Sequence, residues 1–296
     1  MVVAAVDAWP LAGATYSTNF PSTVFFRAKC ESLSPQRVAR DVGRIDILIA
    51  SPECTSHTCA KGNADRSEDS RRTAYQVTRF ARVMKPRWIV IENVVHMRSW
   101  SKYRAWLRRL ESFGYRCRAQ VLDAADFGVP QSRRRLFVIC DRKKDPPEIA
   151  PPRKTRLRTA ATILASPEAY KFTPLRQPRR ATRTLKSAYR AFSAIGKNSR
   201  FLIVYYGTDG GGGWQRLLVP LRTVTTLDRF ALVRPTRNGH EMRMLQVPEL
   251  KRAMGFPPSF KLNQGTRRDR IKMLGNGVCP PVMRAIIATL IRSASD

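Results

Sequence analysis

The sequence of 296 residues is poor in acidic side chains. It has 22 Asp and Glu against 54 Lys and Arg, which gives a formal net charge of +32. Such an excess of positive charge attracts and holds a polyanion, mainly through salt-dependent contacts with phosphates. Hydrophobic residues make up 43% of the chain, enough for a packed core, and this excludes a disordered basic tail. The composition therefore indicates a folded protein with a nucleic-acid partner.

Long hydrophobic runs, an export signal and paired cysteines are also lacking. No apolar run has the length of a membrane span, and no basic segment followed by an apolar stretch begins the chain. Six cysteines scattered without close pairing predict a reducing compartment, the cytoplasm, and no disulfide framework. Cys54, His57 and Cys59 lie close together, but no second ligand pair follows at zinc-site spacing. We therefore predict no metal site.

What the chain does contain is an alternation of short apolar runs and helical stretches. This pattern is typical of an α/β fold with a parallel sheet. We expect strands at 2–6, 45–49, 88–91, 136–139, 201–206 and 217–219, and helices at 10–19, 69–84, 103–113, 248–255 and 281–292. Paired prolines near 146 and 151 mark a linker. The sequence thus predicts a larger domain over 1–142, completed by 270–296, and a smaller region over 143–269.

Two of the predicted strands end at side chains suited to catalysis. Cys54 follows the strand 45–49 in a Ser-Pro-Glu-Cys run, and Glu92 ends the strand 88–91 in a Glu-Asn-Val run. Ligands of parallel sheets bind in the crevice beyond the carboxyl ends of the strands, so we expect both residues at one cleft. A thiol and a carboxyl there suggest a nucleophile with a proton donor or acceptor. The guanidinium groups of Arg133 and Arg135 can hold a carbonyl or a phosphate nearby.

Each of these residues also has an ordinary structural explanation. Cys54 alone would be a buried core thiol, Glu92 a helix cap and the arginine cluster a solvated basic face. Their joint order along the chain, at the edges of predicted elements, favours catalysis instead. The Gly-Asn-Gly-Val-Cys-Pro-Pro run at 275–281, expected to open the last helix, completes a set of four motifs.

These four motifs in this order resemble the DNA (cytosine-5) methyltransferases, and the resemblance covers about 3–291. It implies a Rossmann-like, S-adenosylmethionine-dependent methyltransferase sheet with a smaller target-recognition domain. It also implies double-stranded DNA as substrate and a bacterial or phage restriction-modification context. A basic and aromatic stretch at 153–200, with Glu168 as its one acidic residue, suits such a partner. The glycine run at 210–213 lacks the features of a phosphate loop, so we expect a flexible hairpin tip or a DNA-facing loop.

The resemblance also assigns catalytic roles. It implies that Cys54 attacks C6 of a cytosine flipped out of the duplex and that Glu92 binds and protonates N3. Arg135 would hold the cytosine carbonyl, with Arg133 and Gln131 in support. A covalent bond at C6 makes C5 nucleophilic enough to take a methyl group, and the base must leave the stack to be reached.

For the cofactor, the resemblance implies Asp7 at the ribose, Trp9 at the adenine and Asn276 near the methionine end. The family's first strand and its Phe-x-Gly-x-Gly-Gly loop have no counterpart here, since the one glycine near the start, Gly13, falls within a predicted helix. Glu53 also replaces the usual second proline before the catalytic cysteine. We therefore expect a missing first strand, weak cofactor binding, and a missing N-terminal segment or complementary chain as partner.

Two alternatives to a DNA cytosine-5 methyltransferase follow. One is a non-enzymatic DNA-binding remnant, or one half of a split methyltransferase, which the lack of the glycine loop favours. The other is an RNA cytosine-5 methyltransferase. The long region at 153–219 favours DNA over RNA, because the DNA enzymes place their sequence-reading elements there.

Overall fold

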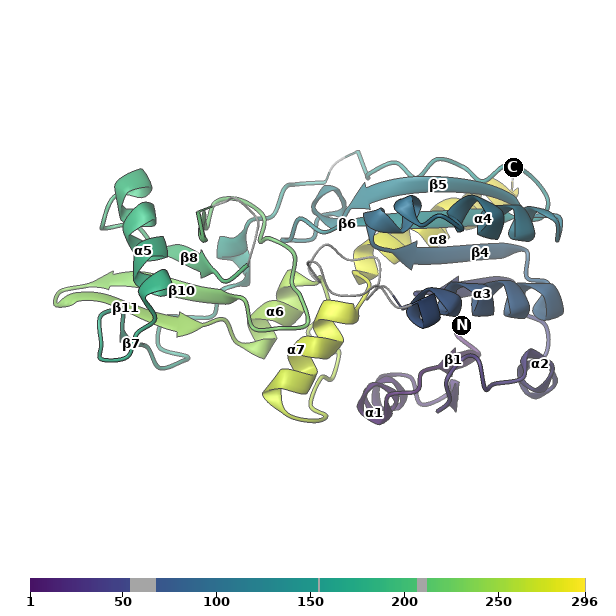
Figure 1. The fold of residues 1–296 in the computed structure, drawn as a ribbon, viewed down its shortest axis with the longest axis horizontal. Coiled ribbons are helices and arrows are strands. Elements are labelled where there is room, and N and C mark those ends of the chain that lie inside the picture. Colours follow the sequence, from purple (N-terminus) through teal and green to yellow (C-terminus); the bar gives the residue numbers. More distant parts are fainter. Residues whose placement is uncertain (54–67, 154, 207–211, 296) are drawn as a thin grey trace.

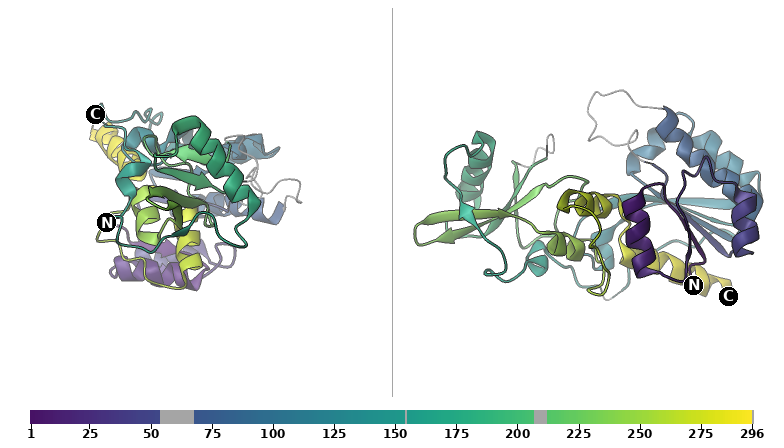
Figure 2. Two further views of the ribbon diagram at one scale, coloured as in Figure 1. Left: turned by 90° about the vertical axis from the view of Figure 1, so that its left-hand side faces the viewer. Right: turned by 90° about the horizontal axis from the view of Figure 1, so that it is seen from below.

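The computed structural model describes residues 1–53, 68–153, 155–206 and 212–295. The molecule is elongated, with a larger unit that contains most of the helices beside a smaller one built on an antiparallel sheet (Figure 1). The view from below separates the two units, with α6 and α7 between them (Figure 2).

A four-stranded mixed sheet forms the centre of the larger unit. Its order is β3-β4-β6-β5, for β3 (Ile47–Ala50), β4 (Trp88–Asn93), β6 (Arg134–Asp141) and β5 (Arg116–Asp123). β3 pairs with β4 in parallel, whereas the β4–β6 and β6–β5 pairs are antiparallel. All of β4 is buried, which explains its continuous apolar sequence.

Helices cover both faces of this sheet. Side chains of α3 (Glu68–Met84) and α4 (Tyr103–Glu111) pack on one face, against Ile91 and Val138 among others. The last helix, α8 (Pro280–Ser295), packs on the opposite face with Val90 and Ile139. The result is a three-layer arrangement, which confirms the α/β fold expected from sequence. The expectation of a parallel sheet is wrong, since of the described strands only β3 and β4 pair in parallel within it and the long strands β5 and β6 form an antiparallel pair.

A separate pair of parallel strands lies next to this sheet. β1 (Ala4–Val6) pairs with β2 (Val24–Phe26) across α1 (Pro10–Asn19), and α2 (Pro35–Val42) follows. Phe26 and Val38 share a small core with Phe80 of α3 and Leu48 of β3, so the strand pair packs against the main sheet's helix layer. Among the described residues no strand hydrogen-bonds to the second edge of β1 or of β3. Ile49 on β3 is accordingly 45% exposed.

The smaller unit contains a five-stranded antiparallel sheet. Its order is β7-β11-β10-β8-β9, for β7 (Thr173–Pro174), β11 (Gly239–Met244), β10 (Phe230–Thr236), β8 (Phe201–Val204) and β9 (Trp214–Arg216). Helix α5 (Thr182–Ile195) covers one face through Ala188 and Ala191. The whole sheet lies within the region 143–269.

The other described helices are two return helices and three short 3₁₀ helices. They are α6 (Val247–Ala253), α7 (Arg267–Asn276), η2 (Val95–Ser99), η3 (Ala124–Phe127) and η4 (Ala160–Ile163). One cluster of buried side chains runs from Val90 and Phe137 of the main sheet through Leu250 and Ile286 to Phe230 of the small sheet. The two units therefore share a core.

Several sequence-based expectations are wrong. The segment 217–219 is a turn, and the strand is β9, three residues earlier, because only Leu217 of the three faces the core. Gly275 and Asn276 end α7, a helix that the sequence analysis missed, and the last helix begins at Pro280. Polar residues dominate α7, so its helical periodicity is weak.

The cysteines are also not all far apart. Cys117 and Cys140 lie directly opposite each other on β5 and β6, with their sulfurs 2.7 Å apart, as free thiols. Strand register alone brings them together, and the sequence carries no signal for it.

One run, Arg267–Ala294, has the length and the apolar composition of a membrane span, contrary to the expectation from sequence. It consists of two helices, α7 and α8, with Gly277 capping the first. Val282, Ile286 and Leu290 of α8 are buried in the shared core. The run is therefore accounted for by packing within the protein.

Candidate active site

A buried ion pair lies at the end of β4. The carboxylate of Glu92 is 3.2 Å from Nε of Arg135 on the neighbouring strand β6. Glu92 stands opposite Phe137, so Arg135, two residues away, projects from the same face of the sheet as a diagonal neighbour. The structure thus brings together two residues that the sequence analysis selected from separate motifs.

The environment of Glu92 favours its protonated form. Burial raises the pKa of this carboxyl, and the nearby charges of Arg135 and Arg133 offset the effect only in part. A hydrogen bond with the side chain of Ser51 acts in the same direction as the arginines. Near neutral pH, Glu92 is therefore better able to give a proton to a bound group than an exposed glutamate.

The segment that leads to Cys54 is held beside this pair. Asn93, next to Glu92, donates a hydrogen bond from Nδ2 to the carbonyl of Pro52 at 3.1 Å. The backbone N–H of Glu53 donates to Oγ1 of Thr73 at 3.0 Å. Cys54 itself lies outside the described residues, as do His57 and Cys59. Hydrogen bonds therefore hold the backbone beside Glu92 as far as Glu53, the residue before the predicted nucleophile.

Arg133 has a different environment from that of Arg135. Its side chain is buried, and its guanidinium donates to the carbonyls of Val224 at 2.8 Å, Gly275 at 2.7 Å and Gly277 at 3.0 Å. These carbonyls belong to the loop before β10 and to the end of α7. The described contacts therefore make Arg133 a positioning residue that ties the smaller unit to the return helix.

Gln131 serves the same junction. Its side chain is fully buried, donates to the carbonyl of Ala253 at 3.1 Å and accepts from the N–H of Val224 at 2.7 Å. The side chains of the Gln-x-Arg-x-Arg run thus have two different environments. Gln131 and Arg133 hold the domain junction, and Arg135 faces Glu92.

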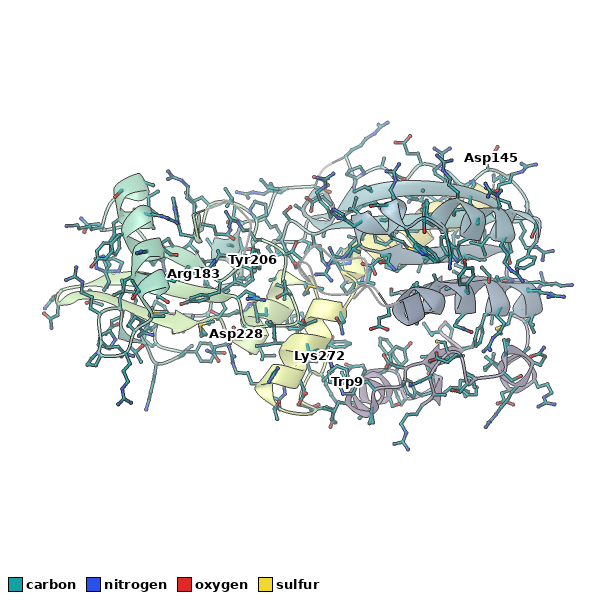
Figure 3. All side chains as sticks on the ribbon, viewed as in Figure 1. Trp9, Asp145, Arg183, Tyr206, Asp228 and Lys272 are labelled. Atoms are coloured by element: carbon teal, nitrogen blue, oxygen red, sulfur yellow. The ribbon has the colours of Figure 1, made fainter. Side chains whose placement is uncertain are left out.

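The three predicted cofactor residues lie at the end of β1, at the start of α1 and at the end of α7. Asp7 is exposed at the end of β1, and its Oδ1 accepts from the N–H of Trp9 at 2.7 Å. The Nζ of Lys272 on α7 is 4.7 Å from the centre of the Trp9 ring, and the two side chains meet where α1 approaches α7 (Figure 3). Asn276 is exposed at the end of α7. A carboxylate and an indole so placed have the chemistry to bind a ribose and an adenine.

Among the described residues there is no group of three potential metal ligands. Cys279 is close enough to the Glu92–Arg135 pair for Arg133, Arg135 and Glu92 to influence its titration. Burial raises the pKa of this thiol to about 11, so it is a neutral packing group at physiological pH. The sequence analysis quoted it only as part of a motif.

A mixed α/β sheet covered by helices on both faces agrees with the fold of S-adenosylmethionine-dependent methyltransferases. The chain belongs to the C-5 cytosine-specific DNA methylase family, whose model matches residues 1–292. Membership of this family implies S-adenosyl-L-methionine as the cofactor.

Similar proteins include enzymes of two kinds. The type II methyltransferase M.DdeI of Desulfomicrobium norvegicum is 31% identical over 157 residues, which are 50% of this chain and 37% of that protein. A tRNA (cytosine(38)-C(5))-methyltransferase of Mus musculus is 26% identical over 181 residues, 60% of this chain and 43% of that protein. The matched part therefore spans well under half the length of either relative.

The fold has close counterparts among solved structures. The crystal structure of the S. pombe Dnmt2 methyltransferase superposes with a TM-score of 0.65 at 16% sequence identity. The match covers 100% of this chain and 92% of that one. At this identity the likeness shows the fold alone.

Proposed function

We propose that this chain is a DNA cytosine-5 methyltransferase that acts through a covalent adduct between Cys54 and the base. The observation that carries the proposal is the buried Glu92, with its raised pKa, paired to Arg135 beside the backbone that leads to Cys54. A duplex substrate agrees with the net charge of +32 and with the family's description as DNA methylases.

The chemistry divides among three side chains. Cys54, as a thiolate whose proton has passed to solvent, forms a bond from its sulfur to C6 of the flipped cytosine while Glu92 gives its proton to N3. Arg135 keeps one N–H on Glu92 and can direct others to the cytosine carbonyl. The electron pair displaced from the C5–C6 double bond makes C5 nucleophilic. When bound, S-adenosylmethionine supplies the methyl group. Loss of the C5 proton to a base and departure of the sulfur from C6 as a thiolate, with return of the N3 proton to Glu92, then restore the aromatic ring and the enzyme.

A mechanism-based trap tests this proposal. In a duplex with 5-fluorocytosine at the target position the C5 proton is replaced by fluorine, so the adduct cannot resolve. A denaturation-resistant complex is expected when cofactor and the further strand proposed below are both supplied. Cys54→Ala should abolish the complex, and Cys30→Ala, at an exposed thiol, should leave it intact. Trapping that survives in Cys54→Ala would overturn the assignment of the nucleophile.

We also propose that activity needs one further β-strand, supplied by another segment of the protein or by a separate chain. The support is the break in the sheet, where β1 and β3 each have an edge without a strand partner among the described residues. The exposed Ile49 would be covered by such a strand. Asp7, Trp9 and Asn276 would then hold the ribose, the adenine and the methionine end. An open apolar edge otherwise favours aggregation.

Cofactor binding tests this second proposal. Calorimetry should show weak binding of S-adenosylmethionine to residues 1–296, and stronger binding after addition of a strand-loop-helix peptide with the family's glycine loop. A helix-loop peptide without the strand is the control. Tight binding by residues 1–296 alone would overturn the proposal. If the supplemented protein binds cofactor but does not trap fluorocytosine, the non-enzymatic DNA-binding alternative is favoured.

The smaller unit and the cellular setting complete the proposal. We assign target recognition to 143–269 and catalysis to 1–142 with 270–296. Methylation of bacterial or phage DNA would take place in the cytoplasm, within a restriction-modification system. The RNA alternative makes a distinct prediction, since a tRNA transcript would then be trapped in place of the DNA duplex.

A further inference from the structure

Two free cysteines face each other on the outer pair of strands of the main sheet. Cys117 is the second residue of β5 and stands directly opposite Cys140, the next-to-last residue of β6. Their sulfurs lie 2.7 Å apart, with the thiol of Cys117 donating to the sulfur of Cys140. Neither residue takes part in the chemistry proposed above, so the pair is available for a separate reaction.

The strand register gives these two residues the spacing of a disulfide. Residues directly opposite each other in an antiparallel pair have Cα atoms about 4.5 to 5.5 Å apart. A disulfide joins Cα atoms about 4.4 to 6.8 Å apart, so a bond between the two sulfurs requires side-chain rotation and little movement of the backbone. Because the strands already hold the thiols in contact, little further ordering opposes the bond.

The two thiols differ in their access to solvent. β5 is the last strand of the sheet, and Cys117 on it is partly exposed, whereas the side chain of Cys140 is fully buried. Burial raises the pKa of Cys140 well above that of an exposed thiol. A small oxidant therefore reaches Cys117 first, and Cys140 is placed to complete the bond from the interior.

A buried hydroxyl lies beside the pair. Burial raises the pKa of Tyr103 on α4, Arg98 offsets this in part, and both thiols are near enough to raise the pKa further. The hydroxyl therefore keeps its proton. In the part of the chain that the structure describes, its Oη makes no hydrogen bond. It can donate to a thiolate formed next to it, and the thiolate is the form that attacks a disulfide.

We propose that Cys117 and Cys140 are a site of reversible oxidation, which closes to a cross-strand disulfide when a low-molecular-weight disulfide such as oxidised glutathione accumulates. In a reducing compartment the pair rests as thiols. On oxidation, the thiolate of Cys117 attacks one sulfur of the small disulfide and releases one small thiolate. The sulfur of Cys140 then attacks that of Cys117 and releases the second. Two protein thiols are oxidised, one small disulfide is reduced to two thiols, and the cysteine protons pass to the released thiolates.

The bridge fastens the two strands that lead to the proposed active site. It closes the loop from 117 to 140, which contains Gln131, Arg133 and Arg135. The cysteines lie at the open end of the β5–β6 pair, whereas Arg135 is paired with Leu122 near the turn. Cys140 also packs on the sheet face covered by α4, opposite to the face of Arg135. The disulfide therefore stabilises this segment and leaves the ion pair of Arg135 in place.

Redox titration of the full chain tests the proposal without catalysis, DNA or cofactor. The protein is equilibrated in mixtures of reduced and oxidised glutathione, quenched with acid, digested and mapped by mass spectrometry. As the oxidised fraction rises, a peptide pair that links Cys117 to Cys140 should form in the folded protein. It should disappear after addition of dithiothreitol.

Thermal unfolding of the oxidised and reduced forms measures the effect of the bridge. The oxidised wild type should have a midpoint higher by about 5 °C or more. Cys117→Ala removes the partly exposed thiol at the sheet edge, so its oxidised and reduced midpoints should coincide. Cys30→Ala, at an exposed thiol, should keep the full difference. Comparison of two redox states of the same variant cancels any effect of the substitution on folding.

Three results would overturn the proposal. They are oxidation that stops at a mixed disulfide of Cys117 with glutathione, a link between Cys117 and Cys140 that forms only in denaturant, and a difference in midpoint that persists in Cys117→Ala. Failure of fluorocytosine trapping would count against Cys54 and leave these measurements unaffected.

Discussion

At the scale of single residues, the proposed chemistry depends on one carboxyl group. Glu92 is buried at the end of the buried strand β4 and forms an ion pair with Arg135. The neighbouring Arg133 instead donates hydrogen bonds to backbone carbonyls. The low-polarity surroundings favour the neutral acid, and Arg135 keeps the group oriented. A glutamate whose pKa is raised by burial suits protonation of a ring nitrogen better than an exposed one.

Replacing Glu92 by Gln should remove catalysis and leave the fold intact. The amide keeps the size and hydrogen-bonding capacity of the side chain but cannot give up a proton. We expect a rate loss of about 100-fold or more, the usual range for a general acid or base. Single-turnover methylation by the active assembly measures it, with circular dichroism as the control. A variant within threefold of the wild-type rate would show that Glu92 is not the proton donor.

The same substitution should change the pH dependence of stability. An unfolded glutamate ionises near 4.5, whereas burial raises the pKa of folded Glu92. Its contribution to the free energy of unfolding is therefore complete below that pH and is lost as the pH rises through the folded pKa. Gln does not ionise, so the stability of Glu92→Gln relative to the wild type should increase with pH. Urea denaturation between pH 4.5 and 8 checks this, and parallel curves would contradict it.

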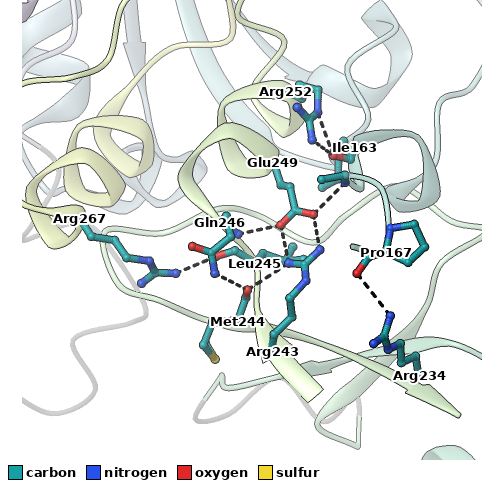
Figure 4. Close-up of polar contacts among 11 residues, drawn as sticks. Ile163, Pro167, Arg234, Arg243, Met244, Leu245, Gln246, Glu249, Arg252 and Arg267 are labelled. Atoms are coloured by element: carbon teal, nitrogen blue, oxygen red, sulfur yellow. Dashed lines mark hydrogen bonds and ion pairs between the residues drawn. The ribbon is translucent and has the colours of Figure 1, made fainter. Parts of the chain in front are cut away.

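At the scale of elements, two buried junctions hold the small sheet to the return helices. One is the end of α7, where Arg133 holds three carbonyls. The other is the buried pair of Arg243 on β11 and Glu249 on α6, with both contacts at 2.7 Å (Figure 4). Glu249 also accepts from the backbone N–H groups of Ala165 and Gln246, so one carboxylate joins three segments.

Gly275→Ala tests the first junction. An added Cβ would lie 2.3 Å from the carbonyl carbon of Thr225, and neither backbone can move without disturbing Arg133. We expect a loss of about 2 kcal/mol or more in the free energy of unfolding, as for other overpacked sites. Gly277→Ala is the matched control, since its Cβ would have a nearest contact of 3.3 Å. Equal stability of the two variants in thermal unfolding would contradict the prediction.

Glu249→Gln tests the second junction. Burial alone would raise the pKa of Glu249, but its bonds from Arg243, Ala165 and Gln246 outweigh this effect and lower the pKa. The pair therefore stabilises the fold above the ordinary glutamate pKa, and this contribution is lost as the pH falls through the lowered value. At neutral pH we expect a loss of about 3 kcal/mol, because Arg243 stays buried without its counter-ion.

The control for this variant is Glu241→Gln, which breaks the partly exposed pair of Glu241 with Arg234. A pair of this kind contributes under about 1 kcal/mol. Denaturant unfolding at pH 7 and pH 4 compares the two variants. A Glu249→Gln protein as stable as Glu241→Gln at pH 7 would contradict the role given to the buried pair.

At the scale of the whole molecule, charge dominates. A formal charge of +32 on 296 residues should hold nucleic acid without cofactor, through phosphate contacts that release counter-ions. Affinity for a duplex should then fall by roughly 10³-fold or more between 50 and 200 mM salt, as expected for six or more phosphate contacts. Fluorescence anisotropy of a labelled duplex measures the slope. A flat response would exclude phosphate contact as the main contribution.

Much of this protein follows from its sequence alone. Continuous apolar runs determine the strands around β4 and β6, and the position of Glu92 at the end of such a run places it at the carboxyl edge of the sheet. Helices α1, α3 and α8 lie within one residue of their predicted starts. Local periodicity and turn residues suffice for these features, because each depends on neighbours in sequence.

Only the tertiary structure determined which residues of distant segments contact each other. The contact of Arg135 with Glu92 depends on the register of two strands, whereas Arg133, two residues earlier, points to the domain junction. The break in the sheet between β1 and β3 and the pairing of Cys117 with Cys140 likewise arise from contacts between segments distant along the chain. Residue type and spacing do not predict such contacts, because many side chains have similar chemistry and only the packing of the folded chain determines which of them meet.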